Sequence, residues 1–335
     1  MTTLDAVRST LADVDLDAIA SNVEAIRARS NADVIAVVKA DAYGHGAEAV
    51  AETCFEAGAV MVAVATVEEG LALREGGVNG PILVLLGPTD SSEVAHAVAQ
   101  DLVLVVWDVE RARAISEAAT ALRRSARVHF KVDTGLTRLG APMKEAPGRY
   151  RAIAALPHLE MDGIFTHFAT ADDPDTSNDR AQLGRFREVL GALVDRPRLV
   201  HAAASAGVSY GHEYRLPRDG RIATVPVGYG DGLPRVAGNR AAVLVRGRRV
   251  PFAGRVCMDL VMLDVTDVDG AREGDEVVLI GAQAGARQSA EDLAEACGTI
   301  NYEIVTGIRR RVPRRYFRGG KVVATRTLAE GYRGR

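Results

Sequence analysis

Short runs of apolar, strand-forming residues recur through roughly the first 200 residues of the chain. Between them lie stretches with helical periodicity, such as 67–77 and 109–124. The seven runs span 34–40, 60–66, 81–87, 102–108, 127–133, 161–168 and 198–205. This alternation predicts βα units, and so many units in series favour a TIM-type βα barrel over a doubly wound sheet. A closed barrel of this type needs about eight strands, so one strand is missing from the pattern.

The pattern changes after about residue 207, where short strands and polar turns follow one another. The strand-like runs lie at 224–232, 241–256, 259–268, 275–283, 311–317 and 321–329. Only 289–298 has a clear helical pattern, and we expect a turn at 299–305. This arrangement is typical of a mostly antiparallel β-domain. We therefore predict two domains, a βα barrel over 1–207 and a β-domain over 208–335.

The composition narrows the class of protein. Of the 335 residues, 47% are hydrophobic and 25% charged, as in globular chains, and the net charge of -3 indicates no general attraction to nucleic acid. The three cysteines are odd in number and have no CxxC spacing, so we expect neither a disulfide framework nor a metal site. No apolar run reaches the length of about 18 residues that a membrane span needs, and the first residues lack the apolar core of a signal peptide. We expect a cytoplasmic protein.

Polar and titratable side chains end four of the predicted strands. Lys39 ends the first run, Lys131 the fifth, His167 the sixth and Ser205 the seventh. The active residues of βα barrels lie at the carboxyl ends of the strands, so these side chains are expected to meet at one rim. A buried lysine there can have a lowered pKa and attack a carbonyl group, although a single lysine at a strand end is more often solvated or salt-bridged. The residues alone predict a barrel enzyme that uses a rim lysine.

The segment AVVKADAYGHGA (36–47) resembles the cofactor-lysine signature of the alanine racemase family, with Asp41 where asparagine is common. Seven further segments resemble blocks of that family, in the family's order. They are HFKVDTGLTRLG (129–140), GIFTHFATAD (163–172), HAAASAG (201–207), VSYG (208–211), VPVGYGDGLPR (225–235), GRVCMDLVMLDV (254–265), and GTINYEI with RVPRRY (298–316). The resemblance covers nearly the whole chain and implies the same barrel and β-domain.

The resemblance implies an isomerase that interconverts L-alanine and D-alanine with pyridoxal 5'-phosphate and supplies D-alanine for peptidoglycan. Lys39 would carry the cofactor. Tyr210 would be the second base, contributed by the other subunit of a homodimer. Racemisation needs two bases because one removes the α-proton and the other returns a proton on the opposite face.

Further positions follow from the same resemblance. Tyr43, Ser205 and Tyr302 match residues that bind the cofactor phosphate. His167 matches a residue of the cofactor site that supports the second base.

Arg138, Met258 and Asp259 match substrate-binding residues, and Met258 would also come from the partner subunit. Lys131 matches a lysine that is often carbamylated. The carbamate would be an anion beside Arg138 and would accept a charge-assisted hydrogen bond from it. The resemblance implies no metal.

The chain departs from the family pattern near the domain junction. Ala204 stands where the family has asparagine. HAAASAG also runs directly into VSYG, whereas the family has a helix, an eighth strand with an Arg-Pro-Gly motif and the start of the β-domain between these blocks. An internal deletion between Ala206 and Val208 explains the missing strand. The lost arginine is the one that meets the pyridine nitrogen of the cofactor in the family.

Three interpretations of the deletion stay open. The chain is a truncated member that folds poorly, it closes its barrel with seven strands or a strand from a partner, or it has become a non-catalytic pyridoxal-phosphate-binding protein. The site residues are retained, which favours a recent deletion. For the function, alanine racemase leads. The alternatives are a racemase of another small amino acid, such as serine, and a catalytically impaired pyridoxal-phosphate-binding homologue that lacks the Arg-Pro-Gly segment.

Overall fold

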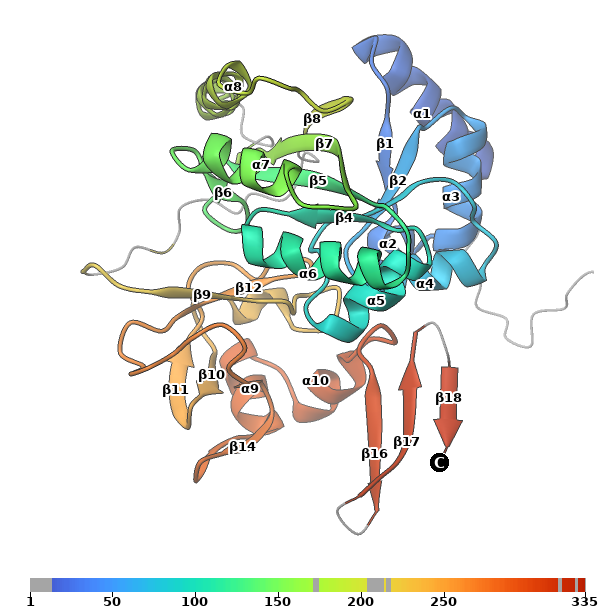
Figure 1. Ribbon diagram of the computed structural model, residues 1–335. Helices are drawn as coiled ribbons and strands as arrows, with labels where there is room; N and C mark the ends of the chain where they lie inside the picture. The colour runs from blue at the N-terminus through green and yellow to red at the C-terminus, as the bar shows by residue number, and fades with distance from the viewer. Residues whose placement is uncertain are drawn as a thin grey trace, which may run out of the picture.

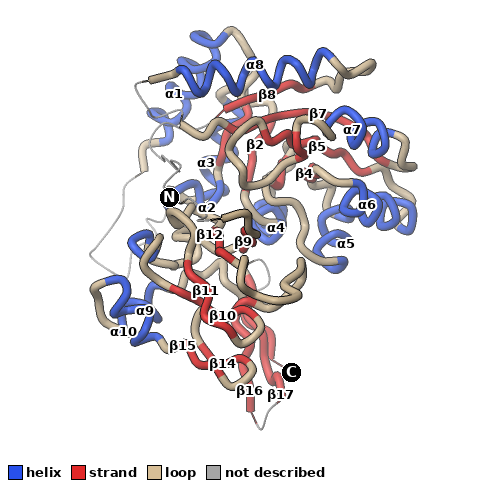
Figure 2. The backbone as a smooth tube through the Cα atoms, turned by 90° about the vertical axis from the view of Figure 1, so that its left-hand side faces the viewer, coloured by secondary structure: helices blue, strands red, loops and turns tan. Residues whose placement is uncertain are grey.

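The computed structural model describes residues 14–170, 175–203, 214, 218–318, 321–328 and 331–334. These residues form two stacked lobes, a βα lobe above and a β-domain below (Figure 1). The second view shows the same division, with the C-terminal strands farthest from the βα lobe (Figure 2). The predicted boundary between residues 207 and 208 lies outside the described residues.

The upper lobe is built on one curled sheet of parallel strands in the order β1-β2-β3-β4-β5-β7-β8, with β6 paired to β5. The strands are β1 (Ile35–Val37), β2 (Met61–Val64), β3 (Ile82–Val84), β4 (Val103–Val106), β5 (Ala126–Asp133), β6 (Ala141–Pro142), β7 (Leu159–His167) and β8 (Leu199–Ala203). The helices are α1 (Leu16–Ser30), α2 (Lys39–Gly44), α3 (Ala47–Glu56), α4 (Val67–Glu75), α5 (Ser91–Ala99), α6 (Val109–Ala121), α7 (Ala146–Ala154) and α8 (Ser177–Gly191). The seven predicted strands and the TIM-type arrangement are therefore confirmed.

Side chains alternate between the two faces of this sheet, as the strand period of two requires. Val62, Leu104 and Phe130 pack outward in the large core shared with the helices. Met61 and Val105 point to the inner face and belong to a second, much smaller cluster. Burial of each large apolar side chain contributes about 1.5–3 kcal/mol. The outer face therefore supplies most of the stability of this lobe.

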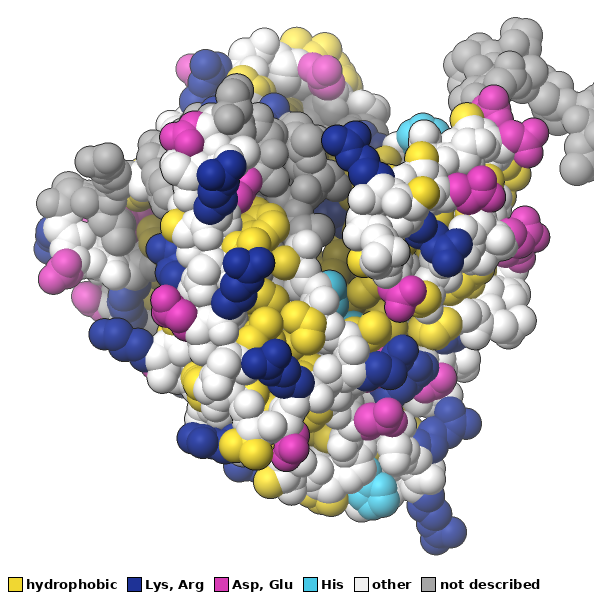
Figure 3. Space-filling model, turned by 90° about the horizontal axis from the view of Figure 1, so that it is seen from above, with side chains coloured by type: hydrophobic (Ala, Val, Ile, Leu, Met, Phe, Trp, Pro, Cys, Tyr) yellow, Lys and Arg dark blue, Asp and Glu magenta, His cyan; other side chains and the backbone are white. Residues whose placement is uncertain are grey.

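The sheet is open among the described residues, because no pairing joins β8 to β1. On the two edge strands, Val37 is 37% exposed and Val200 is 47% exposed. Seen from above, hydrophobic side chains line a furrow between the α8 side and the α1 side of the lobe (Figure 3). Seven strands are too few for the closed barrel, which needs about eight.

The lower lobe contains several small antiparallel sheets, as the sequence predicted. The strands are β9 (Ile222–Val225), β10 (Ala242–Val245), β11 (Arg248–Pro251), β12 (Val261–Asp264), β13 (Val277–Val278), β14 (Gly281–Gln283), β15 (Ala286–Gln288), β16 (Arg314–Arg318), β17 (Lys321–Thr327) and β18 (Gly331–Gly334). The helical elements are the 3-10 turn η1 (Arg235–Ala237), α9 (Ala290–Cys297) and α10 (Asn301–Gly307). Val243, Phe252 and Leu263 lie in the core that these elements share.

The turn expected at 299–305 is wrong, because helix α10 occupies most of this segment. Its β-branched residues obscure the helical period, but one side chain, Ile304, is buried in the β-domain core. Packing against the core and α9 gives this segment a helical conformation that local preference alone does not indicate.

Candidate active site

Lys39 is the second residue after the end of β1, and an unusual left-handed turn follows it. Ala40, Asp41, Ala42 and Tyr43 all have φ between 50° and 58°. Left-handed backbone costs non-glycine residues about 1–2 kcal/mol each. Neighbouring groups must therefore hold the backbone that follows the lysine. Part of this support is local, since the Asp41 carbonyl oxygen accepts from the Gly46 N–H at 3.0 Å.

The Lys39 ammonium is ion-paired with Asp259 of the same chain. Nζ lies 2.5 Å from Oδ2, and the lysine side chain is 17% exposed, whereas the aspartate is buried. Asp259 belongs to the segment between β11 and β12. The β-domain therefore reaches the rim of the barrel from which Lys39 projects.

Arg311 lies behind this ion pair and is only 6% exposed. Its guanidinium donates to Asp231 at 2.7 and 3.2 Å, to Glu69 at 3.0 Å and to Asp259 at 2.9 Å. Burial opposes its charge, but the carboxylates of Asp231, Asp259 and Glu69 outweigh burial and raise the pKa of Arg311. One arginine thus joins α4 of the barrel to two segments of the β-domain.

Lys131, on β5, has a different environment. It is 5% exposed, and its Nζ lies 5.3 Å from the centre of the Phe165 ring. Burial, with smaller contributions from the cations Arg138 and Lys39, lowers the pKa of Lys131 to about 7, although Asp133 opposes the shift. A lysine with such a pKa is partly neutral, hence nucleophilic, near pH 7.

Several sequence-predicted residues gather at this rim. They are Lys39, Lys131, Arg138, Met258 and Asp259. Arg138 and Lys39 both act on the thiol of the neighbouring Cys257, whose pKa is raised mainly by burial. Met258 is buried, and its carbonyl oxygen accepts from the Gly230 N–H at 2.8 Å.

The other predicted residues are less closely associated with the barrel rim than these five. Tyr43 is in the left-handed turn and exposed, and His167 is half-buried at the end of β7. Tyr302 is 71% exposed on α10. Tyr210 and Ser205 lie outside the described residues.

The sequence analysis missed three residues of this site, Glu69, Asp231 and Arg311. A signal existed for Glu69, because Thr66 and Glu69 have the spacing of a helix capping box, which the structure contains. Arg311 lies in the RVPRRY block but had no assigned role. In the part of the chain that the structure describes, no group of His, Cys, Asp and Glu is arranged to hold a metal ion.

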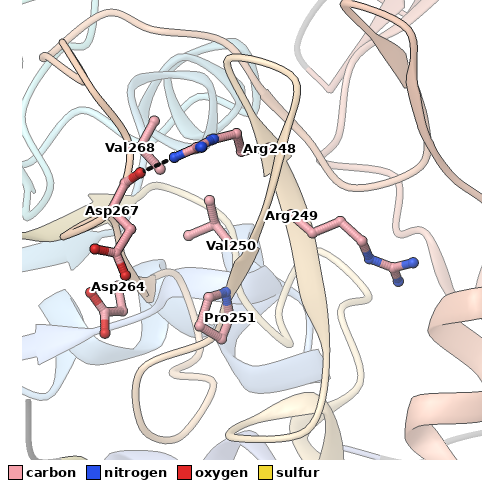
Figure 4. Close-up of a pocket in the computed structure, with 7 residues that line it drawn as sticks. All are labelled: Arg248, Arg249, Val250, Pro251, Asp264, Asp267 and Val268. Atoms are coloured by element: carbon pink, nitrogen blue, oxygen red, sulfur yellow. Dashed lines mark hydrogen bonds between the residues drawn. The ribbon is translucent and has the colours of Figure 1, made fainter. Parts of the chain in front are cut away.

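A separate depression lies on the β-domain (Figure 4). Its lining residues are Arg248, Arg249, Val250, Pro251, Asp264, Asp267 and Val268. Arg248 donates to the carbonyl oxygen of Asp267 across it. None of the predicted site residues lines this depression, so it is distinct from the rim.

The fold and the rim define a two-domain βα-barrel protein whose strand ends carry a lysine covered by a β-domain. The family model for the alanine racemase N-terminal domain matches residues 14–224, and that for the alanine racemase C-terminal domain matches 198–316. The chain belongs to the alanine racemase family of isomerases. Among the described residues, no helix is long and apolar enough to cross a membrane.

Individual relatives agree with this assignment. The chain is 41% identical to alanine racemase of Symbiobacterium thermophilum over 93% of this chain and 98% of that one. The solved alanine racemase from Bacillus anthracis with bound L-Ala-P is 34% identical and has a TM-score of 0.53, covering 94% of this chain and 96% of that chain. Alanine racemase of Clostridium difficile 630 is 30% identical with a TM-score of 0.58, covering 96% and 99%.

The comparison with Symbiobacterium thermophilum also supports an internal deletion. The alignment has 371 positions, but 93% of this 335-residue chain is only about 312 residues, so about 59 positions have no counterpart here. The two family models overlap over 198–224, the region in which the sequence places the deletion.

Proposed function

We propose that this chain interconverts L-alanine and D-alanine with pyridoxal 5'-phosphate bound to Lys39. The observation that carries the proposal is the Lys39 amine at the barrel rim, within the family's lysine signature and at the same rim as the Arg138 guanidinium. A primary amine suits the aldehyde of the cofactor, and Arg138 suits its negative charge. The residues present therefore fit this cofactor, whose phosphate would be held by Tyr43, Ser205 and Tyr302.

When bound, pyridoxal phosphate supplies an electron sink for the charge that develops at the substrate α-carbon. In this proposal Lys39 moves the α-proton on one face, and Tyr210 does so on the other. Arg138 and the Met258 backbone N–H hold the substrate carboxylate. His167 supports Tyr210, and Asp259 is the counter-ion of Lys39. The proposed physiological role is the supply of D-alanine for peptidoglycan in the cytoplasm.

Exchange of the substrate α-proton in deuterated water, followed by NMR, tests the two-base mechanism. The unmodified protein should exchange and invert both enantiomers, and Lys39→Ala should do neither. Tyr210→Phe should still exchange the proton of one enantiomer but not invert it, because only one face keeps its base. Loss of exchange for both enantiomers in a folded Tyr210→Phe protein would contradict the assignment of the two bases.

The same samples separate the alternatives. Faster inversion of serine than of alanine would indicate a racemase of another small amino acid. Cofactor absorbance without any exchange would indicate an impaired homologue. Restored growth of a bacterium that requires D-alanine tests the physiological role.

A homodimer in which Tyr210 and Met258 come from the partner is also proposed. In the structure Met258 and Asp259 reach the rim of their own chain, and a complementation experiment distinguishes this arrangement from a site shared between subunits. Lys39→Ala and Asp259→Asn proteins are mixed, unfolded and refolded together. Recovered activity requires a site shared between subunits, whereas no recovery indicates a site made within one chain.

A further inference from the structure

We propose that Arg311 is a positioning residue for Lys39, acting through Glu69 on the backbone and through Asp259 on the ammonium. The proposal rests on the proposed role of Lys39 as the cofactor lysine. Arg311 is not placed in contact with substrate or cofactor. Its function is to hold two carboxylates, each of which holds a different part of the lysine segment.

The first connection runs through Glu69 at the start of α4. Its Oε1 accepts from Arg311 at 3.0 Å and from the Ala40 N–H at 2.7 Å. Its Oε2 accepts from the Ala65 N–H at 2.7 Å. Ala40 is the first residue of the left-handed turn, so Glu69 holds the backbone at the point where the unfavourable conformation begins.

The second connection runs through Asp259. One carboxylate oxygen, Oδ1, accepts from Arg311 at 2.9 Å, and the other, Oδ2, lies 2.5 Å from Lys39 Nζ. A planar guanidinium with several donors in a rigid fork orients such a carboxylate, which a lysine in its place would not do. The backbone and the ammonium of Lys39 are thus both held by one buried cation.

A simpler role for Arg311 is to compensate buried negative charge and fasten the two domains. Asp231 makes the comparison possible, because it accepts from Arg311 at 2.7 and 3.2 Å and from the Gly228 N–H, whereas among the described residues it makes no hydrogen bond to segment 38–46. Glu69→Gln and Asp231→Asn are therefore matched changes. Each converts one acceptor oxygen of an Arg311 partner into a donor, but only Glu69 contacts the segment at Lys39.

Amide hydrogen exchange of the cofactor-free protein, read by mass spectrometry, tests the proposal. Glu69→Gln and Arg311→Met should speed exchange in peptides covering 38–46 by about tenfold or more, because each removes the charge-assisted hydrogen bond from Arg311 that holds Glu69 against the Ala40 N–H. Asp231→Asn should leave 38–46 unchanged and affect 228–232. Arg309→Met, the same substitution at an exposed neighbouring arginine, is the control for Arg311→Met.

Turnover gives a second readout in the cofactor-loaded protein. Glu69→Gln should lower kcat for alanine with little change in KM, because it misplaces Lys39 and leaves the substrate contacts intact. If Arg311→Met does not fold, Arg311→Lys replaces it and should also speed exchange at 38–46. Unchanged exchange at 38–46 in Glu69→Gln, or equal acceleration there in Asp231→Asn, would overturn the proposal. Amide exchange at 38–46 could be faster only in the expected variants while the unsubstituted protein has no racemase activity. That result would support the positioning role of Arg311 and reject the proposed racemase function.

Discussion

The rim of the barrel has two lysines in opposite electrostatic environments. Lys39 is paired at 2.5 Å with Asp259, and Arg311 connects this pair to the carboxylates of Glu69 and Asp231. Lys131 is buried, and its pKa is lowered to about 7 by burial and by the cations beside it. Both are lysines at the carboxyl ends of parallel strands, so position in the barrel does not by itself decide their chemistry. The neighbouring charges do.

The largest expected effect separates the two lysines by their chemistry. Lys39→Ala should reduce racemisation by about 10³-fold or more, because it removes both the cofactor attachment and a base. The protein is reduced with borohydride in the presence of pyridoxal phosphate, and its peptides are analysed by mass spectrometry. The cofactor should be attached to Lys39 in the protein without substitutions and to neither lysine in Lys39→Ala. Efficient modification of Lys131 in Lys39→Ala would show that the two positions are interchangeable.

The next effect concerns stability on the Lys39 side. Arg311→Met removes the cation that is ion-paired at 3.0 Å with buried Glu69, so we expect the free energy of unfolding to fall by about 3–5 kcal/mol. Urea unfolding measures this change. Arg309→Met, at an exposed position, should change the same quantity by less than about 0.5 kcal/mol. Similar losses in the two variants would mean that the buried network contributes little.

A smaller effect is expected on the Lys131 side, and it depends on pH. The folded pKa is lowered from 10.5 to about 7, so between these values the unfolded chain binds a proton that the folded chain does not. Stability should therefore rise with pH in this window, by at most about 1.4 kcal/mol per pH unit from this group. Lys131→Met should remove this component in urea titrations at pH 7.5 and 9 in carbon-dioxide-free buffer. Exposed Lys144→Met is the control, and an unchanged slope in Lys131→Met would contradict the lowered pKa.

The smallest expected effect is carbamylation of Lys131 by carbon dioxide. A partly neutral amine near pH 7 can attack carbon dioxide, and the resulting anion would be stabilised by Arg138. Carbon-13 NMR with labelled bicarbonate should give a carbamate signal that disappears in Lys131→Met, with about a twofold to fivefold rise in turnover on adding bicarbonate to the unmodified protein. A signal that persists in Lys131→Met would place the carbamate elsewhere.

Much of the fold could be predicted from local patterns. Each of the seven apolar runs overlaps a strand of the barrel sheet, because burial on both faces produces nearly continuous apolar segments. Segment 299–305 could not be predicted in this way. Its helix depends on burial of Ile304 against α9, and the β-branched residues around it indicate no helix by themselves.

The candidate site also has a part that the sequence predicts and a part that it does not. The sequence determined that Lys39 and Lys131 end strands of one barrel and that the chain carries the family's blocks with a segment missing. Only the tertiary structure decided which charges meet these lysines. Glu69 and Arg311 are 242 positions apart, and their contact requires the β-domain to dock on the strand ends. Strand and helix patterns arise from neighbouring residues, whereas ion pairing and a shifted pKa depend on distance and burial in three dimensions. The sequence therefore determines which residues are available, and the packing of the two domains decides which of them act on each lysine.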